Sequence, residues 1–184
     1  MPTTSSVLRD QLRTSFRWRG DRNDPDYLAD VTSWWRDADT LQTIGEGLAD
    51  LFPEAAPTVV MGTQSRGSLL GVLTARHLGV GFAEVRKDPS RSADSDAWWE
   101  TSTPPDYQDR HLRLGLRRSL LQSGDRVLFV DDWVQTGAQV QACHALVEMS
   151  GATWLGAAVV VDGLETNAPR RALTVRSLLS VREL

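Results

Sequence analysis

The sequence predicts an α/β fold in which helices flank an open, mostly parallel, twisted sheet. Residues 126–130 form a short apolar run bounded by turn residues, which is typical of a strand buried on both faces of a parallel sheet. Similar apolar runs alternate with segments of helical periodicity along the chain. The chain has 184 residues, which suffice for one domain with a sizeable core.

The first 56 residues are expected to form a small helical segment ahead of the sheet. Leu41, Ile44, Leu48 and Leu51 recur at helical spacing before Pro53 ends the run. No long linker and no internal repeat follows, so residues 1–184 are predicted to form a single domain with its α/β core in residues 57–184.

The core should alternate strands and helices. We expect strands at residues 58–62, 80–85, 111–116, 126–130, 154–161 and 173–181, and helices at residues 68–78 and 137–149. Gly79 and Gly151 stand where the two helices should end. Residues 87–106 lose all periodicity and are rich in proline and polar residues, so we expect a loop there. A structureless run of this length inside a domain is usually functional or disordered.

Composition and charge exclude several classes of protein. The net charge is -4 and the pI is about 5.4, so no basic surface for nucleic acid is expected. Cys143 is the single cysteine, which excludes a disulfide within the chain and a thiolate metal site. Arg9, Asp10 and Arg13 interrupt any apolar run that could form a signal peptide. Residues 155–161 are too short to span a bilayer, so we expect a cytoplasmic protein with no membrane partner.

Two adjacent acids, Asp131 and Asp132, follow the central apolar run. In parallel sheets ligands bind just past the carboxyl ends of the strands. Ionised carboxylates accept hydrogen bonds from ribose hydroxyls and suit Mg²⁺. The next turn, residues 135–139, leads into a helix whose N-terminus attracts phosphate. Acids for a sugar beside amides for a phosphate predict a pocket for a phosphorylated sugar.

These residues carry a resemblance to a known family. Asp131-Asp132 followed by Thr136-Gly137 resembles the signature with which type I phosphoribosyltransferases bind phosphoribosyl pyrophosphate (PRPP). A second block, residues 59–71 followed by 78–87, is similar to the pyrophosphate loop and next strand of adenine phosphoribosyltransferases. The resemblance covers roughly residues 57–162, and two blocks in the right order are much stronger evidence than one pair of acids.

The resemblance implies an Mg²⁺-dependent, homodimeric enzyme that transfers the 5-phosphoribosyl group from PRPP to a nucleobase and releases pyrophosphate. It also implies the type I fold with an N-terminal hood, residues 1–56, and a mobile loop, residues 87–106, that closes over PRPP and excludes water. The acceptor is purine-like, with adenine as the default.

The resemblance also assigns roles to individual residues. Asp131 and Asp132 would bind the ribose hydroxyls, hold Mg²⁺ through those hydroxyls or water, and stabilise the developing cation. Glu100, which follows Trp98 and Trp99, would be a general acid or base. The 5-phosphate would bind to Gln135, Thr136, Gly137, Ala138 and Gln139. Pyrophosphate would bind to Ser65, Arg66 and Gly67, in a loop that often holds a non-proline cis peptide, and to Arg86 and Lys87.

The sequence departs from the family pattern at three positions. Ala138 and Gln139 stand where relatives commonly have small residues and a closing hydroxyl. Backbone amides can still bind phosphate there, but one hydrogen bond to a charged oxygen is removed unless the Gln139 amide replaces it. Trp133 stands where relatives usually have a small or branched aliphatic residue, and it either reshapes the ribose or base pocket or fills a gap in the core.

Several assignments keep an alternative. Glu100 is equally well explained as an exposed acid in a polar loop. Five aromatic residues of the N-terminal segment either stack on a purine or form that segment's own core: Phe16, Trp18, Tyr27, Trp34 and Trp35. For the whole protein, the alternative is a non-catalytic regulator that senses PRPP or a nucleotide. A nucleotide hydrolase is disfavoured because no water-activating site is evident.

Overall fold

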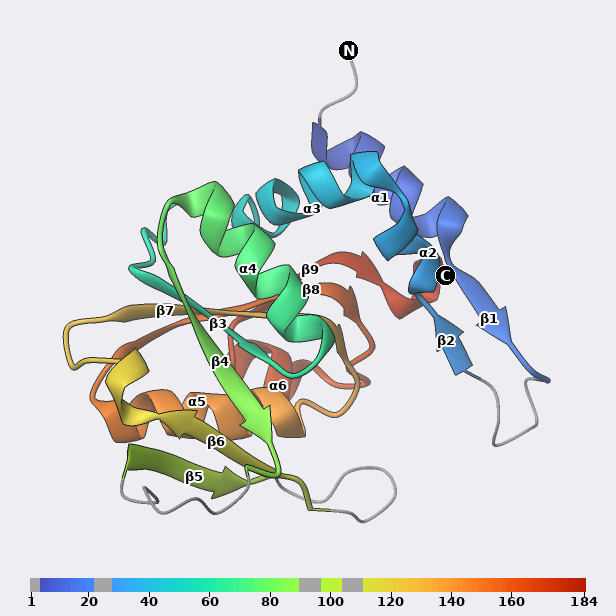
Figure 1. Cartoon of the computed structure of the whole chain (residues 1–184). Helices are drawn as coiled ribbons and strands as arrows, with labels where there is room; N and C mark the ends of the chain where they lie inside the picture. The colour runs from blue at the N-terminus through green and yellow to red at the C-terminus, as the bar shows by residue number, and fades with distance from the viewer. Residues whose placement is uncertain (1–3, 22–27, 90–96, 104–110) are drawn as a thin grey trace.

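A computed structural model of the chain describes residues 4–21, 28–89, 97–103 and 111–184. Its centre is a seven-stranded sheet in the order β5-β6-β4-β3-β7-β8-β9 (Figure 1). Five strands are parallel: β3 (Val59–Thr63), β4 (Gly81–Lys87), β7 (Arg126–Val134), β8 (Thr153–Asp162) and β9 (Val175–Ser180). Antiparallel strands β6 (Arg113–Arg117) and β5 (Trp98–Ser102) extend the edge beyond β4.

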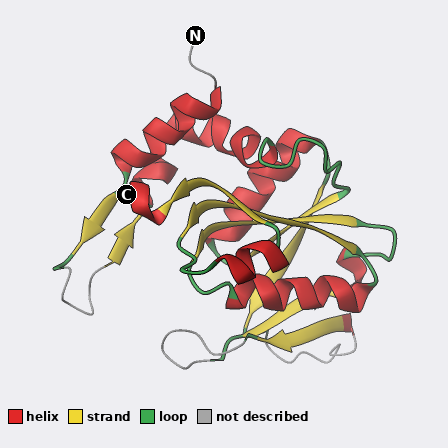
Figure 2. Ribbon diagram, turned by 180° about the vertical axis from the view of Figure 1, so that it is seen from behind, coloured by secondary structure: helices red, strands yellow, loops and turns green. Residues whose placement is uncertain are grey.

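Helices cover both faces of the sheet (Figure 2). One face carries α1 (Thr4–Ser15), α2 (Thr32–Arg36), α3 (Ala38–Ala49) and α4 (Arg66–Leu78). The other carries α5 (Ala138–Ser150) and α6 (Asn167–Ala172). Two short 3-10 helices, η2 (Arg118–Leu120) and η3 (Val181–Glu183), follow β6 and β9. No helix in these ranges combines the length and the apolar character needed to cross a membrane.

Strand β7 shows why the sheet is buried on both faces. Val127 and Phe129 point into the core under α5, while Leu128 and Val130 point into the core under α4 and the N-terminal helices. All four side chains are at most 1% exposed. Burying each large side chain stabilises the fold by about 1.5–3 kcal/mol. The apolar run is continuous because its side chains alternate between the hydrophobic cores on the two faces of the sheet.

The strand order places a crevice between β3 and β7. From β3 the chain crosses to β4 on one side, whereas β7, β8 and β9 follow in order on the other side. Ligands of open α/β sheets bind at such a reversal, outside the carboxyl ends of the strands. The loops after β3 and β7 therefore meet at one place, although about 70 residues separate them in the chain.

The elements expected from the sequence are confirmed for all six strands and both helices of the core. Gly79 and Gly151 end their helices in the left-handed conformation, with φ of 70° and 74°. Cys143 is fully buried, as a small core residue should be. The central strand is longer than expected, because β7 continues through Asp131 and Asp132 to Val134, paired with β8.

Three expectations need correction. Residues 98–102 of the expected loop form strand β5, because pairing with β6 satisfies their backbone and packs Trp99 on the core. The rest of that loop lies largely outside the described residues. The N-terminal segment contains helices, as expected, but also a hairpin of β1 (Arg17–Arg19) and β2 (Leu28–Asp30). Helix α6 was not expected, since its six residues are too few to show a periodicity.

The N-terminal segment is anchored by its own core. Trp34 is fully buried and its Nε1 donates to the carbonyl of Leu12 at 2.9 Å. Phe16 is 5% exposed and packs edge-on against Trp18, with ring centroids 5.2 Å apart. At the other end of the chain Glu183 pairs with Arg9 at 2.8 Å. Phe16 and Trp34 therefore belong to the core of the N-terminal segment, which was one of the two roles considered from the sequence.

Gly62→Ala should destabilise the protein, because a Cβ at this position would lie 2.3 Å from the carbonyl oxygen of Gly67. Helix α4 would have to move away from β3, at a cost of about 1–3 kcal/mol in the free energy of unfolding. Urea denaturation measures this difference. Gly81→Ala is the matched control, since a Cβ there has nothing within 4 Å. Equal stability of the two variants would contradict the close packing of α4 on β3.

Candidate active site

The loop expected to bind pyrophosphate follows β3 directly. Its Gln64–Ser65 peptide bond is cis, as the resemblance implies for this loop. The N–H of Gln64 donates to the carbonyl of Val85 at 3.0 Å, and the Gln64 side-chain oxygen accepts from the N–H of Lys87 at 3.2 Å. The backbone of the loop is therefore tied to the end of β4, which carries the next two predicted ligands.

The two acids of β7 lie in different surroundings. Asp131 is 3% exposed, and its Oδ2 accepts from the hydroxyl of Thr63 at 2.9 Å and from Nε2 of Gln139 at 2.6 Å. Asp132 lies nearer the surface and pairs with Arg66 of the pyrophosphate loop at 2.8 Å. The structure therefore joins the acid pair to both predicted phosphate-binding loops.

Burial changes the acidity of Asp131. The loss of water, and then the charge of neighbouring Asp132, raise the pKa of the Asp131 carboxyl from 3.8 to about 7. Hydrogen bonds from the Asp132 N–H and the Thr63 hydroxyl oppose this rise because they favour the ionised form. The Asp131 carboxyl therefore titrates near neutral pH.

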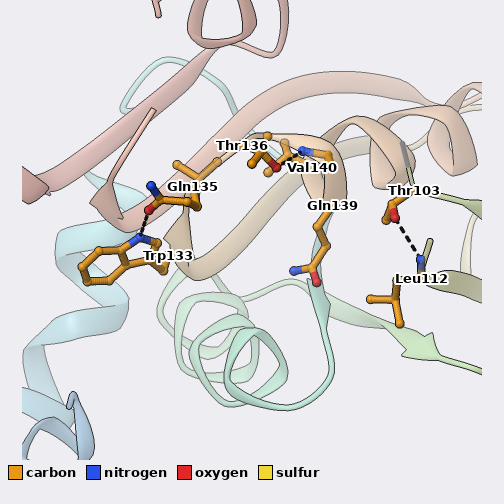
Figure 3. Close-up of a pocket in the computed structure, with 10 residues that line it drawn as sticks. Thr103, Leu112, Trp133, Gln135, Thr136, Gln139 and Val140 are labelled. Carbon is orange, nitrogen blue, oxygen red and sulfur yellow. Dashed lines mark hydrogen bonds between the residues drawn. The ribbon is translucent and has the colours of Figure 1, made fainter. Parts of the chain in front are cut away.

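The predicted 5-phosphate loop, residues 135–139, connects β7 to α5. Gly137 has φ of 84°, a left-handed conformation that glycine adopts without strain. It is the N-cap of α5 and has no capping side chain. The N–H of Ala138 donates to the Thr136 hydroxyl at 3.3 Å, and Gly137 caps none of the N–H groups that follow, so these are available to an anion. A cavity of about 210 Å³ runs along this loop, lined by residues 133–140 with Thr103 and Leu112 (Figure 3).

Arg86 lies on the α4 face at the end of β4. Its Nε contacts Glu84 at 3.2 Å, and Glu84 also accepts a hydrogen bond from Ser68 in the first turn of α4 at 3.1 Å. The Arg86 guanidinium lies 5.8 Å from the ring centroid of Trp98. Glu84 therefore holds a predicted pyrophosphate ligand beside the pyrophosphate loop.

Glu100 stands apart from this group. It lies on β5, and β6 separates that strand from β4. Glu100 pairs with Gly115 of β6, and Gly115 pairs in turn with Arg86 of β4, so the three residues form one row across the strands. The Glu100 carboxylate pairs with Arg113 at 2.6 Å. The row places Glu100 and Arg86 on one face of the sheet edge, whereas the acid pair lies at the centre of the sheet. The role of Glu100 as an acid or base stays a prediction.

Trp133 connects the N-terminal segment to the phosphate loop. Its ring centroid lies 6.2 Å from that of Phe16 and 6.1 Å from that of Trp18. Its Nε1 donates to the side-chain oxygen of Gln135 at 3.0 Å, as Figure 3 shows. Trp133 therefore packs on the N-terminal core and also lines the cavity. Its effect on a ribose or base pocket stays a prediction.

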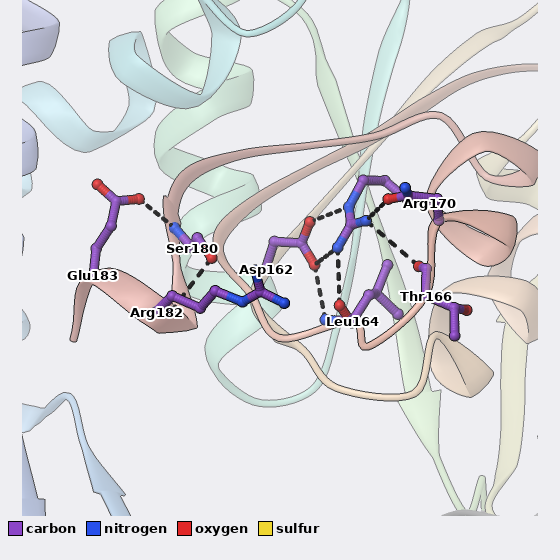
Figure 4. Close-up of polar contacts among 8 residues, drawn as sticks. Asp162, Leu164, Thr166, Arg170, Ser180, Arg182 and Glu183 are labelled. Atoms are coloured by element: carbon purple, nitrogen blue, oxygen red, sulfur yellow. Dashed lines mark hydrogen bonds and ion pairs between the residues drawn. The ribbon is translucent and has the colours of Figure 1, made fainter.

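The loop after β8 closes the neighbouring side of the crevice. Arg170 of α6 contacts Asp162 at 2.5 and 3.2 Å and donates to the carbonyl of Leu164 at 2.9 Å (Figure 4). The N–H of Gly163 donates to the carbonyl of Val134 at 2.8 Å. A Cβ on Gly163 would lie 2.7 Å from the side-chain oxygen of Gln135. The Asp162–Arg170 pair therefore fixes a wall beside the phosphate loop.

Sequence reasoning missed three residues of the site: Thr63, Gln64 and Glu84 hold predicted ligands in place. It named Gln139 as a residue of the 5-phosphate loop, but not that its side chain turns inward to Asp131. A signal existed for Thr63 alone, because a hydroxyl residue that ends a strand beside an acid-bearing strand is well placed to contact the acid. The other contacts depend on side-chain directions that spacing does not reveal.

Taken together, the site can bind a ligand with two anionic ends and a polar middle. N–H groups at the starts of α4 and α5 and the cation Arg86 surround it, and the Asp132 carboxylate lies between the two loops. Within the described ranges, no three acidic, histidine or cysteine side chains form a cage for a metal. Mg²⁺ usually needs no such cage, since it binds through one or two carboxylates together with substrate phosphates.

Comparison with known proteins points to one family. A family model described as "Phosphoribosyl transferase domain" matches residues 38–181. An adenine phosphoribosyltransferase of Synechococcus is 32% identical over 152 residues, covering 82% of this chain and 86% of the relative. The enzyme of the same name from Vibrio vulnificus is 32% identical over 171 residues, covering 92% of this chain and 90% of the relative.

Solved structures give the same result. The crystal structure of adenine phosphoribosyltransferase from Rhodothermus marinus superimposes with a TM-score of 0.80 at 28% identity, over 95% of this chain and 99% of the other. The Saccharomyces cerevisiae enzyme, solved with an imino-altritol bisphosphate and adenine, has a TM-score of 0.76 at 24% identity and supports the fold alone. It covers 94% of this chain and 99% of the other.

Asp131→Asn should change how stability depends on pH. Between the ordinary pKa of 3.8 and the folded pKa of about 7, the folded protein keeps a proton that the unfolded chain has lost. The stability that this carboxyl contributes is therefore greatest below pH 3.8 and is lost as the pH rises through about 7.

We expect the free energy of unfolding of the wild type minus that of the variant to fall by on the order of 1–3 kcal/mol between about pH 5 and about pH 8. Urea titrations of both proteins at the two pH values measure it, and the subtraction removes groups that both share. A difference that stays constant with pH would mean that the folded protein keeps Asp131 ionised throughout.

Proposed function

The chain belongs to the phosphoribosyltransferase family, and from this premise we propose that it transfers the 5-phosphoribosyl group of PRPP to adenine or a related purine, releasing pyrophosphate. Its relatives are adenine phosphoribosyltransferases, which makes a PRPP-dependent pentosyltransferase of purine salvage the best-supported function. The observation that carries the proposal is that the loops after β3 and β7, both proposed to bind phosphate, meet the acid pair at the reversal between β3 and β7.

The proposed roles follow from where the residues lie. The first turn of α5 takes the 5-phosphate, and the loop of Ser65, Arg66 and Gly67 takes pyrophosphate together with Arg86 and Lys87. Negative charge at the end of β7 lies beneath the ribose, where a positive charge develops as the bond to pyrophosphate breaks. Such preorganised charge contributes about 3–4 kcal/mol per well-placed group.

We propose that Mg²⁺ enters with PRPP, near Asp132, through ribose hydroxyls or water. Its supporting observation is the donor set, since carboxylate oxygens suit this ion and Asp132 is 14% exposed at the mouth of the crevice. When bound, the ion neutralises charge on the leaving pyrophosphate. Arg66, which pairs with Asp132, orients the carboxylate toward the pyrophosphate loop.

A homodimer in the cytoplasm is also part of the proposal. Leu69 and Val72 are 55% and 50% exposed on α4, next to the pyrophosphate loop, and a second copy would bury them. The cytoplasmic location is supported by the substrate, because a highly charged phosphorylated sugar does not cross membranes unaided. Of the expected mobile loop, residues 87–106, only the part outside strands β4 and β5 is proposed to close over the substrate.

The first test is a calorimetric titration of the protein with PRPP and Mg²⁺, followed by an assay of pyrophosphate release with a panel of purine and pyrimidine bases. We expect PRPP to bind and adenine, or a related purine, to trigger release. Binding without release for any base would favour a PRPP-sensing regulator instead. Absence of PRPP binding would remove residues 135–139 from the proposed function.

Glu100→Gln should lower kcat more than PRPP affinity if Glu100 exchanges a proton with the base, by about 100-fold or more. Arg113→Met is the matched control, because it breaks the same 2.6 Å ion pair and leaves the carboxyl in place. Steady-state kinetics of both variants separate the two roles. Equal losses in the two variants would make the ion pair, and not proton transfer, the function of Glu100.

A further inference from the structure

Three side chains from three separate segments form a closed ring of hydrogen bonds under the crevice. The Nε2 of Gln139 lies 2.6 Å from the Asp131 carboxylate and 2.8 Å from the Thr63 hydroxyl. The Thr63 hydroxyl in turn donates to the Asp131 carboxylate at 2.9 Å. The donors match the acceptors, because the two N–H bonds of the amide serve two oxygens and the hydroxyl uses its own proton.

The ring joins the places where the ligand-binding segments begin. Thr63 ends β3, directly before the pyrophosphate loop. Asp131 lies on β7 beside Asp132, and Gln139 lies in the first turn of α5, within the 5-phosphate loop. Hydrogen bonds to a buried carboxylate are short and strong, so this ring fixes the three segments relative to one another.

Asp131 is enclosed on its other side as well. Its Oδ1 accepts from the N–H of Asp132 at 2.9 Å, and a Cβ on Gly67 would come within 2.8 Å of the same oxygen. Both carboxylate oxygens are therefore engaged inside the protein. Asp132, by contrast, is held by a single ion pair with Arg66, whose side chain is 46% exposed.

We propose that the two acids have different tasks: Asp132 meets the ribose, whereas Asp131, with Thr63 and Gln139, is a positioning residue that sets the spacing of the two phosphate sites. This division rests on the proposed function. Gln139 then serves the 5-phosphate through its backbone alone, because its side chain is committed to the ring. Gln139, which stands where relatives commonly have a closing hydroxyl, therefore serves to hold Asp131 and Thr63 in place.

The two tasks should have different kinetic signatures. Spacing of the phosphate sites affects substrate and transition state alike, so its loss raises the KM for PRPP and changes kcat little. Charge beneath the ribose matters most in the transition state, so its loss lowers kcat. The comparison of Asp131→Asn with Asp132→Asn therefore separates a positioning acid from one that contacts the reacting sugar.

We expect Thr63→Val, Gln139→Met and Asp131→Asn each to raise the KM for PRPP by about tenfold or more, as removal of a hydrogen bond to a charged group predicts. The double variant Thr63→Val/Gln139→Met should be no worse than the weaker-binding single variant, because both changes open the same ring. Thr63→Ser keeps the hydroxyl, and its KM for PRPP should therefore equal that of the wild type. Asp132→Asn should instead lower kcat.

Thr40→Val is the control for removal of a buried hydroxyl. Thr40 is 1% exposed in α3, its hydroxyl has no hydrogen-bond partner among the described residues, and its loss should leave KM unchanged. Thermal unfolding of every variant shows whether it is folded at the assay temperature. Lower stability with unchanged KM in the ring variants would overturn the proposal, as would equal kcat losses in Asp131→Asn and Asp132→Asn.

The wild-type assay tests the proposed function separately. If the wild type binds PRPP but releases no pyrophosphate, the function fails, and calorimetric PRPP affinity of the same variants still decides the division of tasks. In that case about tenfold weaker binding in the three ring variants, with Thr63→Ser at wild-type affinity, supports the ring. A wild type that binds no PRPP would overturn both.

Discussion

The site depends on the parallel pairing of β3 with β7. The register sets Gly62 beside Val130, so that Thr63 and Asp131 become neighbours at the carboxyl ends of the two strands. The pyrophosphate loop follows Thr63, and the acid pair begins at Asp131, on the strand that leads into the 5-phosphate loop. Because the chain leaves the two strands in opposite directions, the loops open a crevice between them. The absence of a side chain on Gly62 lets α4 approach β3 closely enough to present its N-terminus there.

A buried carboxylate at this junction would be costly without partners. Asp131 receives N–H or O–H donors from β3, from its own strand and from α5, and these contacts compensate for part of its lost hydration. The same burial raises its pKa to about 7. Asp132, only one residue further along, keeps a more exposed carboxylate that pairs with Arg66. Adjacent acids in the sequence thus acquire different environments, because successive residues of a strand point to opposite faces.

The N-terminal segment reaches the site through Trp133. Its ring packs against Phe16 and Trp18, and its Nε1 bonds to Gln135 of the phosphate loop. A small aliphatic residue at this position would leave the N-terminal core without this contact. A tryptophan suits this position because its apolar ring packs on the N-terminal core while its polar N–H bonds to the phosphate loop.

The sequence by itself determined the fold class, the order of the core strands and helices, and the segments that form the site. Apolar runs, helical periodicity and the block from Asp131 to Thr136 depend on neighbours in the chain, and they are local enough to be read from it. The tertiary structure alone decided that residues 98–102 pair as β5, that Glu100 faces Arg113, and that Gln139 turns inward to Asp131 and Thr63. Each of these depends on the direction of a side chain, or on a strand partner, brought close by the packing of distant segments, and no periodicity in the sequence records that direction.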